Sequence, residues 1–144
     1  MMIRRKSHIA LAALSALAIA PFATAQQAGK VTVTVSNVTN ANGTIRGSLC
    51  PDADVFARTE CPNAVNASAP AAAGAVVLNF ADVKPGIYGL AVFHDEDGDG
   101  QINVFSDAFA FGNNAKDLPP IFETAALKVT GDLKTETTLF RMVQ

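Results

Sequence analysis

The chain lacks tryptophan altogether, and it has a single tyrosine and only two cysteines among its 144 residues. The absence of tryptophan and the single tyrosine argue against a sugar-binding platform built from aromatic rings. No nucleophile elbow, phosphate-binding loop, H-E-x-x-H sequence or dinucleotide fingerprint occurs, so no enzyme class is supported. Basic residues are also outnumbered, with 11 lysines and arginines against 13 acidic residues. The charge balance therefore excludes nucleic acid and anionic membrane surfaces as favoured partners.

The first 25 residues predict a secretory signal peptide. Basic residues at 4–6 precede an apolar segment at 9–20, and the Ala-Thr-Ala sequence at 23–25 has the form of a cleavage site. The apolar segment is shorter than the roughly 20 residues that a membrane-spanning helix needs, so we expect cleavage and no stable membrane insertion. No cysteine follows the site, which argues against a lipoprotein. We expect an exported protein, periplasmic or secreted, with residues 26–144 forming one domain.

The predicted mature chain is acidic. The leader contains three of the 11 basic residues and none of the 13 acidic ones, which leaves 8 basic against 13 acidic residues and a formal charge of −5. Cys50 and Cys61 are predicted to form a disulfide, because an exported chain meets an oxidising compartment. Closing this loop would stabilise the fold by roughly 3 kcal/mol in the loop-entropy model. The alternatives are two free thiols, or a metal-binding pair that lacks enough further ligands.

Short strands separated by turn signals follow the leader. Residues 30–36 (KVTVTVS) alternate valine with polar residues, as in a half-buried strand. Further strands are predicted at residues 44–50, 75–80, 87–94, 108–111, 124–130 and 135–142. Residues 51–74 carry no such pattern and predict a long loop. No segment after the leader keeps a helical period over three turns, so the sequence predicts an all-β fold, an antiparallel β-sandwich of about seven strands.

The strand predicted at residues 87–94 is apolar on both faces and is followed at once by an acidic, glycine-containing loop, DEDGDG. This loop satisfies D-x-D-x-D-G, the first half of an EF-hand-type calcium loop. Calcium takes six to eight oxygen ligands, and carboxylates at alternate positions before a sharp turn surround one point. The predicted metal ligands are Asp95, Asp97, Asp99, the carbonyl of Gln101, Asn103 and Asp107. Ser106 stands where an EF-hand loop has its bidentate glutamate, so Asp107 is the candidate for the missing carboxylate.

Two alternatives apply to this region. The loop is an ordinary solvated turn if its aspartates only bind local backbone. Against that, three aspartates so close repel one another by something like 1 kcal/mol per pair, a cost that a turn does not require. His94, the only histidine after the leader, is a weak zinc ligand or general base on its own, and we expect its ring to pack beside the loop. Calcium is favoured over magnesium because the ligands are many and flexible.

Three segments together carry a family resemblance. They are KPGIYGLAVFHDEDGDGQIN at residues 84–103, FGNNA at 111–115 and LPPIFETAAL at 118–127. They resemble the pattern PPGxYxxxVFHDxNxNGxxD, an asparagine turn and PPxFxxA of the bacterial family called domain of unknown function 2141. The resemblance extends from residue 84 to the C-terminus, and more loosely over GTIRGSL in the first hairpin.

The resemblance implies an exported β-sandwich of the transthyretin or carboxypeptidase-regulatory type with no established activity. Its loop is also similar to calcium loops in the B-type repeats of bacterial surface adhesins. Asn103 stands where the family has an aspartate, and VFSDAFA replaces its Gly-x-Pro-x-Glu segment, which leaves Asp107 as the nearby acid. Both departures remove charge from the expected ligand set and predict weaker metal binding.

These observations lead to one functional hypothesis and two alternatives. The first is an exported, non-catalytic β-sandwich module that holds a structural calcium ion and has an unknown protein or small-ligand partner. The second is a small-ligand carrier or envelope-associated binding protein that uses the sandwich interior or the loop at residues 51–74. The third is a metal-assisted hydrolase that uses His94.

Overall fold

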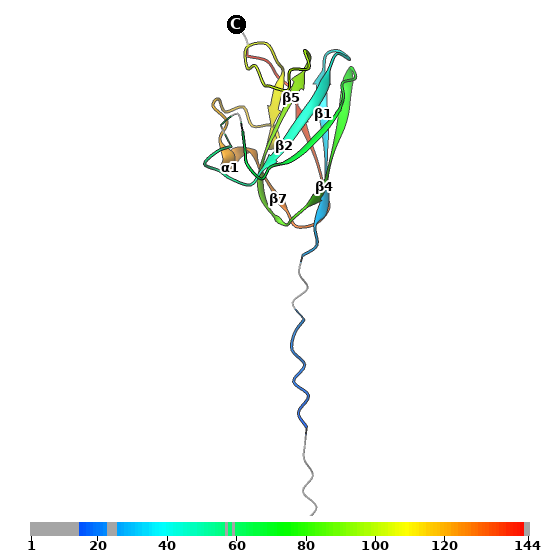
Figure 1. The fold of residues 1–144 in the computed structure, drawn as a ribbon, viewed down its shortest axis with the longest axis vertical. Coiled ribbons are helices and arrows are strands. Elements are labelled where there is room, and N and C mark those ends of the chain that lie inside the picture. The colour runs from blue at the N-terminus through cyan, green and yellow to red at the C-terminus, as the bar shows by residue number, and fades with distance from the viewer. Residues whose placement is uncertain (1–14, 23–25, 57, 59, 143–144) are drawn as a thin grey trace, which may run out of the picture.

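A computed structural model describes residues 15–22, 26–56, 58 and 60–142. Two β-sheets pack face to face, which confirms the predicted β-sandwich (Figure 1). The basic segment, the first part of the apolar segment and the cleavage site of the predicted leader lie outside the described residues. Residues 15–22 have no regular secondary structure and extend away from the sandwich (Figure 1). Within the described ranges, no helix is long and apolar enough to cross a membrane.

The first sheet has the strand order β4-β1-β8, and the second has the order β3-β2-β5-β6 with β7 also paired to β5. The strands are β1 (Gly29–Val38), β2 (Thr44–Cys50), β3 (Val65–Pro70), β4 (Gly74–Val83), β5 (Gly86–Asp95), β6 (Phe109–Phe111), β7 (Ala126–Val129) and β8 (Leu133–Thr138). Two short helices, η1 (Gly112–Asn114) and α1 (Phe122–Ala125), connect β6 to β7. Strands β6 and β7 pair with successive halves of β5, so they lie end to end along one edge of it.

The core between the sheets is built from alternate residues, as the sequence pattern of β1 predicts. Val31, Val33 and Val35 are fully buried and face the second sheet. The sheets approach closely at Gly47 of β2, where an added Cβ would lie 2.7 Å from the Leu78 side chain and 2.8 Å from that of Phe80. Glycine is required there because the opposing side chains already fill the space that a larger residue would need.

A second hydrophobic cluster covers the outer face of β5. It contains Phe56, Phe109, Phe111 and the partly buried Phe122, which meet in tilted and edge-to-face pairs. This cluster explains why the β5 sequence is apolar on both faces, because both of its faces are packed. The central strand that ends at the acidic loop is therefore covered on both faces over most of its length.

The prediction of a loop throughout residues 51–74 is wrong for its second half. Strand β3 lies there and pairs antiparallel with β2 from Leu49↔Val65 to Thr44↔Pro70. Its sequence, VNASAP, has small and polar residues with low strand propensity, and backbone pairing at the sheet edge overrides that local preference. The first half of the segment remains a loop closed by a disulfide, as expected.

Two other strand predictions need correction. Residues 122–125 form helix α1, so the strand predicted at 124–130 is limited to β7. The last strand ends at Thr138, after which Leu139 donates its backbone N–H to Ser36 and Phe140 pairs with Phe109 in the second sheet. The chain leaves the first sheet there, and β8 pairs with β1 in parallel, so the sandwich is mixed and has eight strands in the described residues.

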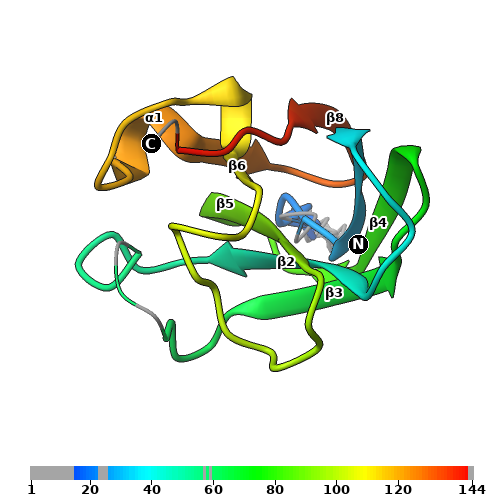
Figure 2. The same ribbon diagram turned by 90° about the horizontal axis from the view of Figure 1, so that it is seen from above.

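One end of the sandwich gathers the loops that matter for a site. Strand β5 ends there, and the turn from β1 to β2 lies at the same end. The C-terminal segment after β8 also reaches this end (Figures 1 and 2). The first residues of β1 and the turn from β4 to β5 lie at the opposite end (Figure 1).

Candidate metal centre

The first aspartate of the predicted metal loop lies at the end of strand β5. Asp95 is its last residue and is fully buried, whereas Asp97 and Asp99 are exposed in the loop that follows. One carboxylate oxygen from each of these three residues lies within 4.8 Å of the others. Two oxygens bound to one calcium ion at about 2.4 Å are at most twice that distance apart. The three carboxylates therefore meet the basic distance requirement for a shared cation.

The aspartates also organise the loop backbone. Asp95 accepts hydrogen bonds from the backbone N–H of Gly98 (3.0 Å, to Oδ1) and of Gly100 (3.1 Å, to Oδ2). Asp97 accepts one from Asp99 N–H at 3.1 Å, and Asp99 accepts one from Gln101 N–H at 2.8 Å. The bonds to Asp97 and Asp99 are local side-chain turns of the kind that aspartate favours. The loop is thus ordered by backbone hydrogen bonds to Oδ1 of Asp97 and of Asp99, and the second oxygen of each accepts from no backbone N–H among the described residues.

The turn between β1 and β2 contacts the start of the acidic loop. Gly43 has φ +67°, and an added Cβ would lie 2.0 Å from the carbonyl oxygen of Asp95. The two backbones are in direct contact, so no side chain fits between them. This contact fixes the position at which β5 releases the chain into the acidic loop.

Arg46 of β2 neutralises Asp95. Its Nε donates to Oδ2 of Asp95 at 2.6 Å, and the arginine side chain is partly exposed while the aspartate is fully buried. Burial alone would raise the pKa of Asp95, but the hydrogen bonds from Arg46 and Gly100 outweigh burial and hold that pKa below its usual value. Asp95 is therefore charged at neutral pH.

Asp97 behaves in the opposite way. The hydrogen bond from Asp99 N–H lowers its pKa, but partial desolvation and the charges of Asp99 and Asp95 together raise the pKa above its usual value. The repulsion predicted from the spacing of the aspartates is therefore present in the folded loop. A bound cation would relieve it.

A second arginine holds the two ends of the wider loop together. Arg141, near the C-terminus, donates to the backbone carbonyl of Ser106 and to Oε1 of Glu96. Burial would raise the pKa of Glu96, but the hydrogen bond and charge of Arg141 outweigh it and lower that pKa. The C-terminal segment thus closes the loop from residue 96 to residue 106.

Asp107, a further predicted ligand, is not part of the carboxylate cluster among the described residues. Asp107, which is nearly buried, accepts hydrogen bonds from the backbone N–H of Asn103 at 2.7 Å and from Ser106 Oγ at 3.3 Å. The Asn103 side chain accepts from Phe105 N–H at 3.1 Å. Gln101 is exposed next to Asp99, where its backbone carbonyl would have to serve as the predicted ligand. Asn103 and Asp107 thus order a separate turn after the acidic loop.

His94 points into the sandwich and is fully buried. Its Nε2 lies 2.6 Å from the carbonyl oxygen of Asn42, which can only accept, so Nε2 carries the proton and donates it. Nδ1 has no hydrogen-bond partner among the described residues and lies 3.7 Å from Oε1 of Glu96. The ring packs beside the loop, as expected, and it is closed off from any substrate in solvent.

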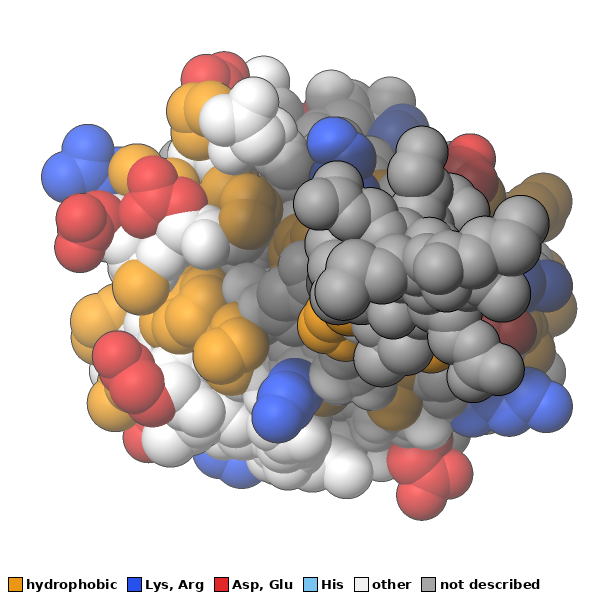
Figure 3. Space-filling model, turned by 90° about the horizontal axis from the view of Figure 1, so that it is seen from below, with side chains coloured by type: hydrophobic (Ala, Val, Ile, Leu, Met, Phe, Trp, Pro, Cys, Tyr) orange, Lys and Arg blue, Asp and Glu red, His pale blue; other side chains and the backbone are white. Residues whose placement is uncertain are grey.

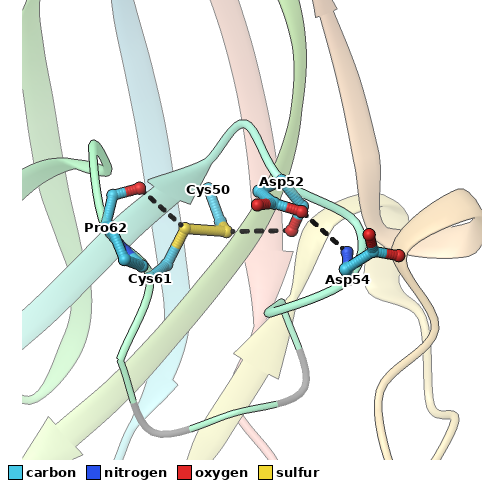
Figure 4. Close-up of a disulfide and its surroundings, with 5 residues drawn as sticks. All are labelled: Cys50, Asp52, Asp54, Cys61 and Pro62. Atoms are coloured by element: carbon cyan, nitrogen blue, oxygen red, sulfur yellow. Dashed lines mark hydrogen bonds between the residues drawn. A yellow bond between two sulfur atoms is a disulfide. The ribbon is translucent and has the colours of Figure 1, made fainter.

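The predicted disulfide is present between Cys50 and Cys61, with a Cα–Cα distance of 5.9 Å (Figure 4). Within the loop that it closes, Asp52 accepts a hydrogen bond from Asp54 N–H at 2.9 Å (Figure 4). Phe56 of the same loop packs over Gly89, where an added Cβ would lie 2.6 Å from its ring. The disulfide loop therefore acts as a cover for the second hydrophobic cluster.

A small hollow of about 260 Å³ lies at the end opposite to the acidic loop. It is lined by Gln26, Pro85, Gly86, Ile87, Lys128, Val129 and Thr130. Figure 3 looks at this end and shows hydrophobic side chains gathered on one part of it. The volume is below the usual range for small-molecule sites.

The sequence does not predict the two arginines that contact the loop, Arg46 and Arg141. Arg46 was part of a correctly predicted strand, and Arg141 lies beyond the end of β8. The one local signal for Arg46 is its charge between Ile45 and Gly47, which indicates that its side chain faces outward. The partner of each arginine depends on strand pairing across the sheet, which a single sequence does not specify.

Comparison with known proteins supports the family resemblance. A family model described as "Uncharacterized protein conserved in bacteria (DUF2141)" matches residues 33–137. No curated protein and no solved structure gives a significant match. The matched span runs from within β1 to within β8 and includes the disulfide, Arg46 and the complete acidic loop. The chain therefore belongs to the DUF2141 family.

Proposed function

We propose that this protein is an exported, non-catalytic β-sandwich module that binds one structural calcium ion through Asp95, Asp97 and Asp99. The observation that carries the proposal is the convergence of three carboxylate oxygens within 4.8 Å in a loop whose backbone is already ordered. Calcium prefers such oxygen ligands and tolerates their irregular arrangement. The backbone carbonyl of Gln101 and water would complete the coordination.

The electrostatics of the loop support the same proposal. Asp97 and Asp99 are exposed and have no cationic partner among the described ion pairs, while Asp95 has Arg46. A divalent ion would offset the repulsion that raises the pKa of Asp97. It would also join the end of β5 to the loop, so its role would be to rigidify this end of the sandwich.

Export and the absence of catalysis rest on separate observations. The leader sequence predicts export, and the disulfide is of the kind that forms in oxidising compartments. His94, the residue on which a hydrolase would depend, is fully buried with its Nε2 proton donated to Asn42. A general base must reach the proton that it removes, and this ring cannot reach a substrate without rearrangement of the sandwich.

The proposal predicts calcium-dependent thermal stability that is lost when the exposed aspartates are neutralised. Mature protein would be unfolded by heat with calcium, with magnesium and with chelator, beside Asp97→Asn/Asp99→Asn. Calcium at a hundredfold over its dissociation constant should stabilise the native protein by about 2.7 kcal/mol. Magnesium should do less, because it demands a stricter octahedral geometry.

A matched control is available in the disulfide loop. Asp52 and Asp54 are also exposed aspartates two residues apart with a side-chain turn between them. The variant Asp52→Asn/Asp54→Asn removes the same charge and should keep the full calcium response. A calcium response that survives in Asp97→Asn/Asp99→Asn, or one that is absent from the native protein, would show that the loop is an ordinary turn.

A further inference from the structure

Arg46 is the cationic side chain that contacts Asp95 among the described ion pairs. It belongs to β2, not to the loop, and its Nε contacts Oδ2 of Asp95 at 2.6 Å. The side chain of Asp95 is fully buried, whereas that of Arg46 is 40% exposed. The arginine can therefore move toward solvent, while the aspartate cannot.

The hydrogen bonds of Asp95 leave little capacity for a second cation. An ionised carboxylate has about four acceptor positions. Arg46 and the backbone N–H of Gly100 both bind Oδ2, and the N–H of Gly98 binds Oδ1. Three positions are thus used, and the N–H groups of the glycines are fixed by the loop. The position held by Arg46 is the only one of the three that a side-chain movement can vacate.

We propose that Arg46 is a built-in competitor of the calcium ion, and that it sets the affinity and the reversibility of the site. This inference rests on the proposed calcium site. In the free protein the guanidinium group neutralises the buried carboxylate of Asp95. In the bound protein the ion attracts all three aspartates and repels Arg46, which weakens or breaks its contact with Asp95. Because the two cations share one carboxylate, each reduces the affinity of the loop for the other.

We expect Arg46→Met to lower the stability of the metal-free protein and to raise its affinity for calcium. The metal-free variant should be less stable than the native protein, because a buried carboxylate loses its charged partner. Its calcium association constant should rise by about tenfold or more, because a positive charge next to the ion has been removed. A residue with a purely structural role would produce the first effect without the second.

Calorimetric calcium titration of purified mature protein would test this inference. The native protein, Arg46→Met, Arg46→Lys and Arg58→Met would be compared at one ionic strength. Arg58→Met removes the same charge from the exposed disulfide loop and should change the association constant by less than about threefold. Arg46→Lys keeps the charge and should bind calcium as weakly as the native protein. The Nε–H signal of Arg46 in nitrogen-15 NMR spectra should also shift as calcium is added.

The outcomes separate the inference from the proposed function. If the native protein binds calcium and Arg46→Met binds it equally tightly or more weakly, the inference is overturned and the calcium site remains supported. Binding to Arg46→Met but not to the native protein would support the inference, with the arginine as the dominant cation. If neither protein binds calcium, both proposals fail. Should Arg46→Met not fold, an unchanged Arg46 Nε–H signal in calcium-bound native protein would overturn the inference.

Discussion

Neighbouring aspartates in the acidic loop have opposite electrostatic character. Asp95 is buried with three hydrogen-bond donors and a lowered pKa, whereas Asp97 is exposed and has a raised pKa. Burial does not by itself decide which carboxylate is easier to protonate, because hydrogen bonds and neighbouring charges act on the same group. The buried aspartate gives the loop its shape, and the exposed ones carry its unbalanced charge.

The lowered pKa of Asp95 predicts acid sensitivity that depends on Arg46. A carboxyl group with a lower pKa in the folded than in the unfolded protein contributes stability above its unfolded pKa, near 3.8, and loses it as pH falls through the folded pKa. Urea unfolding of metal-free protein should therefore give a free energy of unfolding that falls below about pH 4. The fall should be smaller in Arg46→Met, because burial then opposes ionisation with less compensation.

Asp97 acts against this trend, since a raised pKa stabilises the folded protein as pH falls. Asp97→Asn isolates that effect and serves as the control, because it should steepen the acid loss in the native background. Parallel pH profiles for the native protein and Arg46→Met would contradict the role assigned to the ion pair.

Among the elements, every described strand except β3 was predicted at about its place in the sequence, whereas helix α1 was not. The valines of β1 identify its buried face from the sequence alone, and the two apolar faces of β5 correspond to two separate clusters. Strand β3 was missed because its side chains contribute little and its existence depends on the ladder to β2. Helix α1 was missed because Phe122 turns toward Phe56, a contact between distant parts of the chain.

In the candidate site too, some features could be predicted from the sequence and others depend on strand pairing. The aspartates and their alternate spacing are local features, and the three that converge were all predicted from the sequence. The contact of Gly43 with Asp95 and the ion pair with Arg46 both join β2 or its turn to β5. They depend on the register Thr44↔Asp95, which only the paired sheet defines.

The close contact at the turn between β1 and β2 makes a prediction at the scale of the element. Gly43→Ala should destabilise the protein by roughly 2 kcal/mol or more, because the new Cβ would overlap the carbonyl oxygen of Asp95 in a backbone conformation that alanine disfavours. Gly74→Ala is the control, since Gly74 also has positive φ but has no atom within 4 Å of an added Cβ. Denaturant unfolding should therefore show a smaller loss for Gly74→Ala, and equal losses would mean that the contact adds nothing.

For the molecule as a whole, the succession of short strands and turn signals predicted the fold class correctly but not the connectivity. Many short strands with turn signals led to a β-sandwich, which the two packed sheets confirm. The parallel pairing of β1 with β8 was not expected, because hairpins are the only pairings that turn signals reveal. Its partners lie at opposite ends of the sequence.

Export makes a testable prediction for the whole molecule. Expression of the full chain in a bacterium should yield protein that begins at Gln26 and has no reactive thiol, as read from intact mass and alkylation. The same domain made without residues 1–25 should remain reduced in the cytoplasm and be less stable by roughly 3 kcal/mol, because the loop from Cys50 to Cys61 is then open. A full-length product with two reactive thiols would contradict export.

The parallel pair of first and last strands also constrains when the protein can fold. Ribosomes make the chain from its N-terminus, so β1 emerges long before Leu133, the first residue that pairs with it in β8. Until then one hydrogen-bonding edge of β1 has no partner, and such an edge readily joins other chains. Pairing over so great a sequence separation is also slow. Completion of the first sheet must therefore wait until β8 has been made, and a chain that stops before residue 133 should aggregate.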